Sequence, residues 1–419
     1  MSDSKHGSRL STKLVLGAII LLALVVRVGF VSTLEEDLYW PDPTYYDAFA
    51  WNLITGESLS GEPLYDAVKR APLQAFLMTI PYAAAGHSYR AAYFFQAVLG
   101  GLFIPLLAFL IGVRLKSAGV GLVTALLAAV YPYYIYISGA LYATQTSTIL
   151  LLLVVYLAVR ASQTRGVGVL ILQGVSLGAL VLTRSIGIIL LPLSVLWTWP
   201  KRGITKAVIV ALVAVVVVAP WTIRNYNVTG EIIAVSVGGG REFLHGVAPG
   251  ATGTSQSRTP LPGDLLAIRS TLPQGEWDKM CYQRGFEFIK ADPVRFVKLY
   301  GAKFLNLYRF YPNTITTNEH TSSTTMWISI ISSGPVLLLG LAGIWLERRR
   351  WMVYLPVLSV IVGFSFVYSA FTTCIRYRLP IDVYFMLFAA VALGAIAGKL
   401  GGRLGRFFDE APTENAVSE

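Results

Sequence analysis

Long apolar runs constrain this chain more than any other feature of its sequence. A helix needs about 20 residues to cross the hydrocarbon core of a bilayer. Only 14% of the residues are charged, against roughly a quarter in soluble domains. Backbone polar groups inside a bilayer must be satisfied within their own segment, so such runs predict helices. We therefore expect an all-α polytopic membrane protein of about ten transmembrane helices, at 14–34, 91–113, 118–139, 141–159, 167–183, 186–199, 205–221, 326–346, 352–371 and 379–398.

The net charge of +11 is explained by topology. With the N-terminus in the cytoplasm, every inner loop is basic, as the positive-inside rule requires. The first outer loop, about 35–71, has eight acidic and two basic residues. This distribution argues against nucleic-acid binding and predicts a multi-pass plasma (inner) membrane protein with both termini cytoplasmic. The inner basic residues are Lys5, Arg9, Lys13, Arg114, Lys116, Arg160, Arg165, Lys201, Arg202, Lys206, Arg348, Arg349, Arg350, Lys399, Arg403 and Arg406.

Two long outer segments interrupt the membrane domain, which we expect to cover residues 1–398. The first, 35–90, contains an amphipathic stretch typical of a juxtamembrane helix. Its last part, 71–86, is apolar but short, and counting it as a span would move the basic loops outside, so we expect it in the outer interface. The second, 222–325, begins Gly-rich and then becomes helical. The polar tail, 399–419, is expected in the cytoplasm.

Two carboxylates follow the first span. Asp42 and Asp47 lie among Tyr45 and Tyr46, and tyrosine is enriched at membrane interfaces. Asp42 precedes Pro43, an order typical of a helix start, so one interpretation is an N-cap. The other is a general base at the membrane surface.

Arginines on the outer side need an explanation, because topology disfavours them there. Lipid headgroups and a pocket for a phosphate both suit the bidentate guanidinium, and both interpretations stay open. Pro380 favours extended backbone before it, which would place Arg376 and Arg378 on one face. Arg27, inside the first span near its outer end, either extends to the interface or pairs with an anion. The outer arginines are Arg70, Arg184, Arg224, Arg376 and Arg378.

Familiar cofactor motifs are absent from the sequence. The outer histidines His87, His245 and His320 lack metal-ligand spacing, and there is no Walker A, GxGxxG or HExxH motif. Cys281 and Cys374 both fall on the outer side, where a disulfide stays open.

Several segments resemble the GT-C superfamily, in particular the family 39-like group of protein O-mannosyltransferases and lipid A aminoarabinose transferases. The resemblance covers about 15–395. It departs at Pro43, where many relatives have Glu, and at Gln145, where relatives commonly have Glu. The segments are PDPTYYDAFAWNL with Asp42, Arg70-Ala71-Pro72-Leu73, LTRS (182–185), APWTIRNYNVTGE (219–231), GGGREFLHGVAPGATG (238–253) and RYRLPIDVYF (376–385).

The resemblance implies a membrane glycosyltransferase on a GT-C-like catalytic domain. It would move a sugar, with inversion, from a polyprenyl-phosphate donor to a lipid, glycan or protein acceptor on the outer face. No cofactor is required; a divalent metal stays open. Asp42 would be the base, with Asp47 secondary. A transporter or flippase of lipid-linked sugars and a non-enzymatic envelope-assembly subunit are the alternatives. The implied donor-phosphate ligands are Arg70, Arg376, Arg378, Arg184 and Arg27, and other substrate contacts are Tyr45, Tyr46, Gln145, Arg224 and His245.

Overall fold

The computed structural model describes residues 2–38, 41–56, 68–253, 260–312, 322–402 and 407–408, and their side chains except those of 2–10, 41–42 and 200–201. Each regular element in these ranges is a helix. All ten apolar runs form helices, which confirms the expected fold class. They are α1 (Ser2–Ser32), α5 (Tyr89–Leu115), α6 (Ala118–Val130), α8 (Ala143–Gln163), α9 (Gly168–Thr183), α10 (Leu190–Arg202), α11 (Ile204–Thr229), α16 (Ser323–Leu346), α17 (Leu355–Ala370) and α18 (Ile375–Leu400).

Six of these helices, α1, α5, α8, α11, α16 and α18, are long and apolar enough to cross a membrane, counting only the described residues. The others are shorter apolar helices. The third apolar run, 118–139, is divided because Pro132 starts the five-residue α7 (Pro132–Tyr136) after an extended Tyr131. Burial of the spanning windows is highest in α18 (78%) and α8 (72%) and lowest in α11 (17%), so α8 and α18 form the centre and α11 the periphery.

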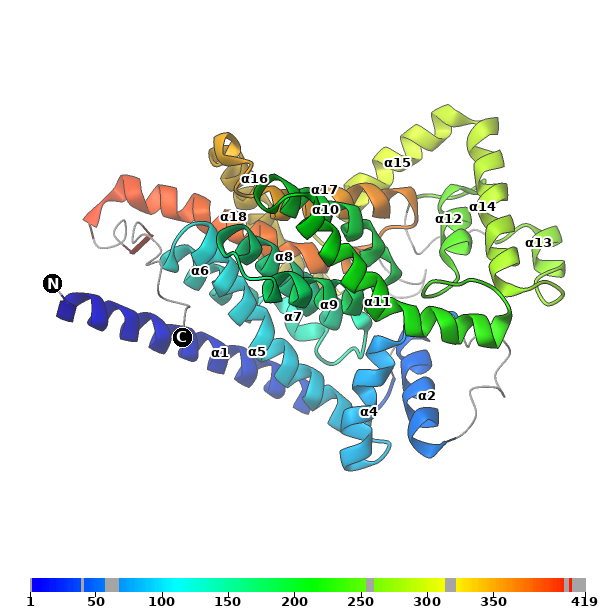
Figure 1. Cartoon of the computed structure of the whole chain (residues 1–419), viewed down its shortest axis with the longest axis horizontal. Helices are drawn as coiled ribbons and strands as arrows, with labels where there is room; N and C mark the ends of the chain where they lie inside the picture. The colour runs from blue at the N-terminus through cyan, green and yellow to red at the C-terminus, as the bar shows by residue number, and fades with distance from the viewer. Residues whose placement is uncertain are drawn as a thin grey trace.

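The two outer segments gather at one end of the molecule. Figure 1 shows the start of α1 and the end of α18 at the left of the view, whereas α2 (Pro41–Thr55), α4 (Leu73–Ala85) and the helices α12 to α14 lie at the right. The latter are α12 (Gly239–Val247), α13 (Gly263–Ala267) and α14 (Gln274–Ala291), followed by α15 (Pro293–Leu307). The 71–86 segment therefore becomes α4, packed on α2 within the outer group.

Glycines allow close approach in two helix pairs. A methyl group added at Gly343 of α16 would overlap the carbonyl oxygen of Phe388 in α18. One added at Gly112 of α5 would lie 2.6 Å from the Cα of Gly121 in α6. Small residues at such contacts let helix backbones pack closely inside a membrane, where no hydrophobic effect drives helices together.

Candidate functional site

Asp42 lies in the first turn of α2, which begins at Pro41. Its side chain is outside the described part of the structure. The turnover of an Asp42 variant must therefore decide between the N-cap and the base. Three residues further along α2, Tyr45 accepts a hydrogen bond from Nζ of Lys69, whose ammonium also lies 3.8 Å from the centre of the tyrosine ring. The guanidinium of Arg70 lies 5.7 Å from the same ring. The start of α2 and the Lys69–Arg70 segment are therefore neighbours.

Asp47 faces away from these basic residues. It is buried, and its Oδ1 accepts a hydrogen bond from the Tyr82 hydroxyl at 2.6 Å and contacts Nε2 of His87 at 2.7 Å. The His87 ring stacks on Trp51 at 4.5 Å. Because Asp47 and Tyr45 are two residues apart, they diverge by about 200° on the helix. Asp47 thus fastens α2 to α4 and to the short connection before α5, and its place does not favour a direct role in catalysis.

Residues 236–237 form hydrogen bonds both to the segment before Arg70 and to the segment after Arg184. The backbone NH of Val237 donates to the carbonyl of Val68 at 2.9 Å, and the hydroxyls of Ser185 and Ser236 are 2.7 Å apart. Segments distant in the sequence are therefore adjacent at the end of the bundle that also carries α2 and α4.

Arg184 and Arg376 adjoin one tyrosine ring. The guanidinium carbons of Arg184 and Arg376 lie 5.2 and 5.6 Å from the centre of the Tyr377 ring. Tyr377 stacks on Tyr368 with centroids 4.8 Å apart, and Arg376 also lies 4.3 Å over Tyr142. Nη1 of Arg184 is buried and has no hydrogen-bond partner among the described residues. We call Arg184 and Arg376, which adjoin the same ring, the arginine cluster.

The α8 and α4 helices meet beside this cluster. Tyr142 is the N-cap residue of α8, and Thr146 in the next turn donates to Oε1 of Gln74 at 2.7 Å. Gln74 lies one turn after Arg70, at the start of α4. This buried bond brings the Arg70 segment toward Tyr142 and hence toward Arg376.

The predicted pairing of Arg376 with Arg378 is wrong. Residues 375–379 are helical rather than extended, so the two side chains diverge by about 200°. Arg378 is fully buried: Nε donates to Asp382 at 2.7 Å, and Nη1 donates to the carbonyls of Leu307 and Arg309 at 3.1 and 2.8 Å. These bonds outweigh the preference that Pro380 imposes on the preceding residue, and they make Arg378 a structural residue.

Arg27 and Gln145 are also occupied by the fold. Arg27 is fully buried and donates to the carbonyls of Ala128 and Ala129, at 3.1 and 2.8 Å, and so caps the C-terminal end of α6. Gln145 accepts from Ser138 at 3.0 Å and donates to the Gln96 carbonyl at 2.6 Å. None of these contacts joins Arg27 or Gln145 to the arginine cluster.

The remaining predicted contacts are dispersed. Arg224 lies over the Trp221 ring at 4.6 Å and donates to Asn225 at 3.2 Å. Tyr46 is buried among the packed residues of α2, α4 and α5, and His245 lies on α12. His320 is outside the described residues.

Within the described ranges, no group of three or more His, Cys, Asp or Glu side chains is placed so that it could hold a metal ion. Cys281 and Cys374 are both free thiols in the structure. Burial, more than the neighbouring Asp278, raises the pKa of Cys281 to about 12, so this thiol stays protonated and unreactive.

The tyrosines around the arginine cluster were missed by sequence analysis. Tyr377 lies between two arginines in the sequence, and Tyr142 immediately precedes α8. An arginine next to an aromatic residue is a usable signal for cation–π stacking. Tyr368, however, reaches the site from α17, and no sequence spacing connects it with Arg184.

Comparison with known proteins identifies the fold. Residues 69–223 match the dolichyl-phosphate-mannose-protein mannosyltransferase family. The chain is 15% identical to the solved oligosaccharyltransferase of Archaeoglobus fulgidus in its apo form, with a TM-score of 0.60 over 94% of this chain and 51% of that chain. The chain has the GT-C fold. This confirms the resemblance to the GT-C superfamily.

Two further GT-C structures are similar to the chain. One is the same archaeal enzyme with an inhibitory peptide and a dolichol-phosphate, 15% identical with a TM-score of 0.56, covering 94% of this chain and 51% of that chain. The other is ArnT of Cupriavidus metallidurans bound to undecaprenyl phosphate, 17% identical with a TM-score of 0.43, covering 92% and 79%. The chain spans about half the length of the archaeal enzyme. No curated protein matches it.

Proposed function

We propose that this GT-C protein is a glycosyltransferase that takes its sugar from a polyprenyl-phosphate donor at the outer face of the inner membrane. One observation carries the proposal: Arg184 holds a buried Nη1 with no partner among the described residues, and Arg376 adjoins the same tyrosine ring. A buried guanidinium nitrogen without an acceptor is costly, and a phosphate oxygen would satisfy it. The matched family, which is described by a dolichyl-phosphate sugar donor, supports this donor class.

We assign the base of the reaction to Asp42, in the first turn of α2. The acceptor hydroxyl or amine gives its proton to the carboxylate of Asp42 and attacks the anomeric carbon opposite the phosphate. The bond from that carbon to the phosphate oxygen breaks, and its electron pair stays on the phosphate. Arginines placed beforehand stabilise this negative charge where it develops, and one such preorganised contact is typically worth about 3 kcal/mol. The product sugar has inverted configuration, and the acceptor is a lipid, glycan or protein.

Turnover of the arginine variants tests the donor site. In defined lipid, purified Arg184→Ala and Arg376→Ala should each lose about 100-fold or more in the release of polyprenyl phosphate from a radiolabelled lipid-phosphate sugar. Arg184→Lys should remain impaired, because Lys lacks the bidentate fork. Arg348→Ala, an exposed arginine at the other end of the molecule, is the control. Full activity in both alanine variants would remove the phosphate site from the arginine cluster.

Asp42→Asn tests the base. The amide keeps the size and most of the capping ability of the carboxylate but cannot accept the proton, so turnover should fall about 10²–10⁴-fold at unchanged thermal stability. Asp47→Asn should mainly lower the unfolding temperature, since Asp47 binds Tyr82 and His87. If Asp47→Asn abolished turnover while Asp42→Asn did not, the base would be reassigned. A flippase would move the donor across the membrane and release no polyprenyl phosphate in this assay.

A further inference from the structure

Helix α15 carries an exposed apolar stripe in the large outer segment. Val294, Val297 and Leu305 are 63, 68 and 73% exposed. At 100° per residue, these three and Gly301 fall within an arc of about 80° on the helix. The opposite face, with Leu299 and Leu307, is buried against the rest of the protein. α15 therefore has two apolar faces. One packs inside the protein and the other is exposed.

On one side, the stripe continues into the lipid-facing surface of the bundle. Tyr300 and Phe304 border the stripe, and both rings lie 6.5 Å from that of Phe366 in α17. The Tyr300 hydroxyl donates to the Phe366 carbonyl at 2.7 Å. Phe366 and Val362 of α17 are themselves exposed, on one of the predicted spans. Figure 1 shows α15 rising obliquely from the bundle beside α17. The exposed apolar surface thus runs from the span onto α15.

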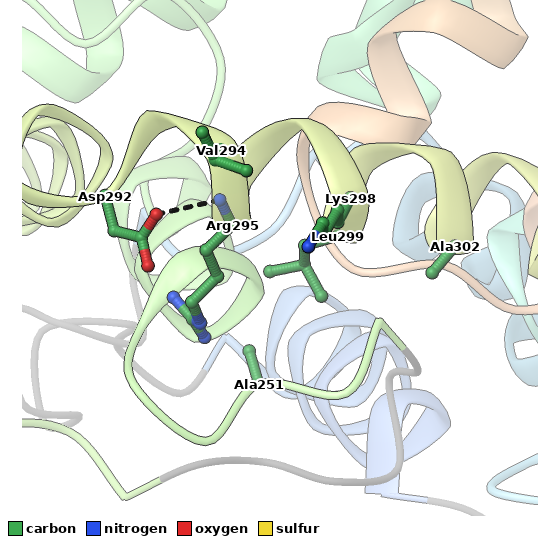
Figure 2. Close-up of a pocket in the computed structure, with 7 residues that line it drawn as sticks. All are labelled: Ala251, Asp292, Val294, Arg295, Lys298, Leu299 and Ala302. Carbon is green, nitrogen blue, oxygen red and sulfur yellow. Dashed lines mark hydrogen bonds between the residues drawn. The ribbon is translucent and has the colours of Figure 1, made fainter.

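On its other side, the stripe is bordered by cations. Lys298 and Arg295 follow it around the helix, at the edge of an open groove of about 470 Å³ between α15 and the segment of Ala251. Figure 2 shows the Arg295 side chain directed toward that segment. Its guanidinium is fixed by the carbonyls of Val247 and Ala248, at 2.9 and 2.6 Å. The groove has one carboxylate, Asp292, which accepts from the backbone NH of Arg295 and caps the helix.

We infer that α15 docks on the outer leaflet of an anionic phospholipid bilayer. The stripe of Val294, Val297, Gly301 and Leu305 enters the acyl region, and Lys298 and Arg295 meet the headgroup phosphates at the groove. An apolar stripe with basic residues along its edge is the composition of helices that lie in the membrane interface. Long basic side chains extend from such a helix to the headgroups. Continuity with the lipid-facing side of α17 selects a bilayer over a soluble partner as the occupant.

The depth of α15 can be measured directly. A fluorophore that reports polarity is attached to Val297→Cys, in full-length protein with Cys281→Ala and Cys374→Ser, in nanodiscs with anionic phospholipid. Lipids brominated along the acyl chain should quench most of the emission, and aqueous iodide little of it. Glu287→Cys on α14 is the control, and its label should respond in the opposite way. A Val297 label open to iodide and unaffected by brominated lipid would overturn the inference.

The headgroup contact has its own test, with Lys298→Gln in the labelled protein. One basic residue near an anionic surface should change the ratio of lipid to aqueous quenching about fivefold. This change should appear in anionic nanodiscs and be absent in zwitterionic ones. Lys290→Gln, an exposed lysine at the end of α14, is the matched control. An equal ratio for Lys298→Gln and the parent in anionic lipid would refute the phosphate contact. Capture of a second protein copy by α15, seen as dimers of constant size in both lipids with the label shielded from both quenchers, would also refute the proposal.

Discussion

Two arginines that are separated by one residue in the sequence have unrelated environments. Arg376 lies over Tyr142 as a member of the arginine cluster, whereas Arg378 is buried with Asp382. Asp382 also accepts a hydrogen bond from the Tyr131 hydroxyl at 2.9 Å. The outer arginines could be recognised from the positive-inside rule, but that rule does not separate a ligand-binding residue from a structural one. Which arginine faces the site depends on whether residues 376–378 are helical. Hydrogen bonds to distant segments hold them in a helix.

Removal of Arg378 should destabilise the fold. Arg378→Ala leaves the buried carboxylate of Asp382 without its cation, and breaking a buried ion pair in this way costs about 3–5 kcal/mol. Thermal unfolding in detergent should show a clear drop for Arg378→Ala and almost none for Arg376→Ala. The double variant Arg378→Met/Asp382→Leu should recover much of the loss. Equal unfolding temperatures for the two alanine variants would contradict the structural role of Arg378.

Lys303 gives the outer segment a dependence on pH. Its Nζ is buried and donates to the Ala370 carbonyl at 3.2 Å, and burial, followed by the charge of Arg295, lowers its pKa to about 8. The unfolded chain holds this proton up to a pKa of about 10.5, so between these values the unfolded state binds more protons. Stability should therefore rise with pH in this window, by at most about 1.4 kcal/mol per unit.

The Lys303 effect is measured by comparing variants. Unfolding temperatures between pH 7.5 and 10, a range of about two and a half units around the lowered pKa, should increase more in the parent than in Lys303→Met. Lys298→Met, which removes an exposed lysine from the same helix, should keep the slope of the parent. The same slope in Lys303→Met and in the parent would show that another group is responsible.

At the scale of elements, hydropathy predicted the helices because each apolar run must satisfy its own backbone hydrogen-bonding groups inside the membrane. It predicted their ends less well. Pro132 ends α6 after Val130, as the rule for residues before proline requires, but Pro380 lies inside α18. Arg378 explains the difference, since its bonds to Asp382, Leu307 and Arg309 hold the first turns of α18 in place. No local pattern reveals such bonds, because their partners come from distant segments.

The contact of α16 with α18 should tolerate no side chain at Gly343. Overpacking a close helix contact costs about 1–3 kcal/mol, so Gly343→Ala should lower the unfolding temperature. Gly334→Ala on the same helix is the matched control, because nothing lies within 4 Å of a methyl group added there. A stability loss that is equal in both variants would mean that helix propensity, and not the approach of Phe388, sets the cost.

At the scale of the whole molecule, charge and hydropathy indicated the direction of the spans. The structure places the start of α1 and the end of α18 at the end opposite α2, α4 and the helices α12 to α14 (Figure 1). At that same end, Lys116 pairs with Glu347 at 2.6 Å. The lateral order of the helices could not be predicted, since apolar faces look alike in sequence. The arginine cluster depends on that order, because Arg184, Tyr368 and Arg376 come from three different regions of the chain.

Thiol labelling in intact cells tests which side is outside. In protein with Cys281→Ala and Cys374→Ser, we expect a membrane-impermeant maleimide to label Lys290→Cys on α14, but to reach Arg349→Cys only after permeabilisation. Arg349 lies in the basic turn between α16 and α17, and the positive-inside rule places it in the cytoplasm. Labelling of Arg349→Cys in intact cells would invert the topology and move the proposed site to the cytoplasmic face.

The Arg378–Asp382 pair also bears on how descendants of a common ancestor would diverge. Losing either partner alone strands a charge, so substitutions at 378 and 382 should occur together on the same branches of a phylogeny. Arg376 shares no hydrogen bond with that pair in the contacts described above and would bind the donor phosphate, so its retention should be independent of the pair. In a deep alignment of relatives, residue 382 should covary with 378 and not with 376, although 376 and 378 would be read as one motif.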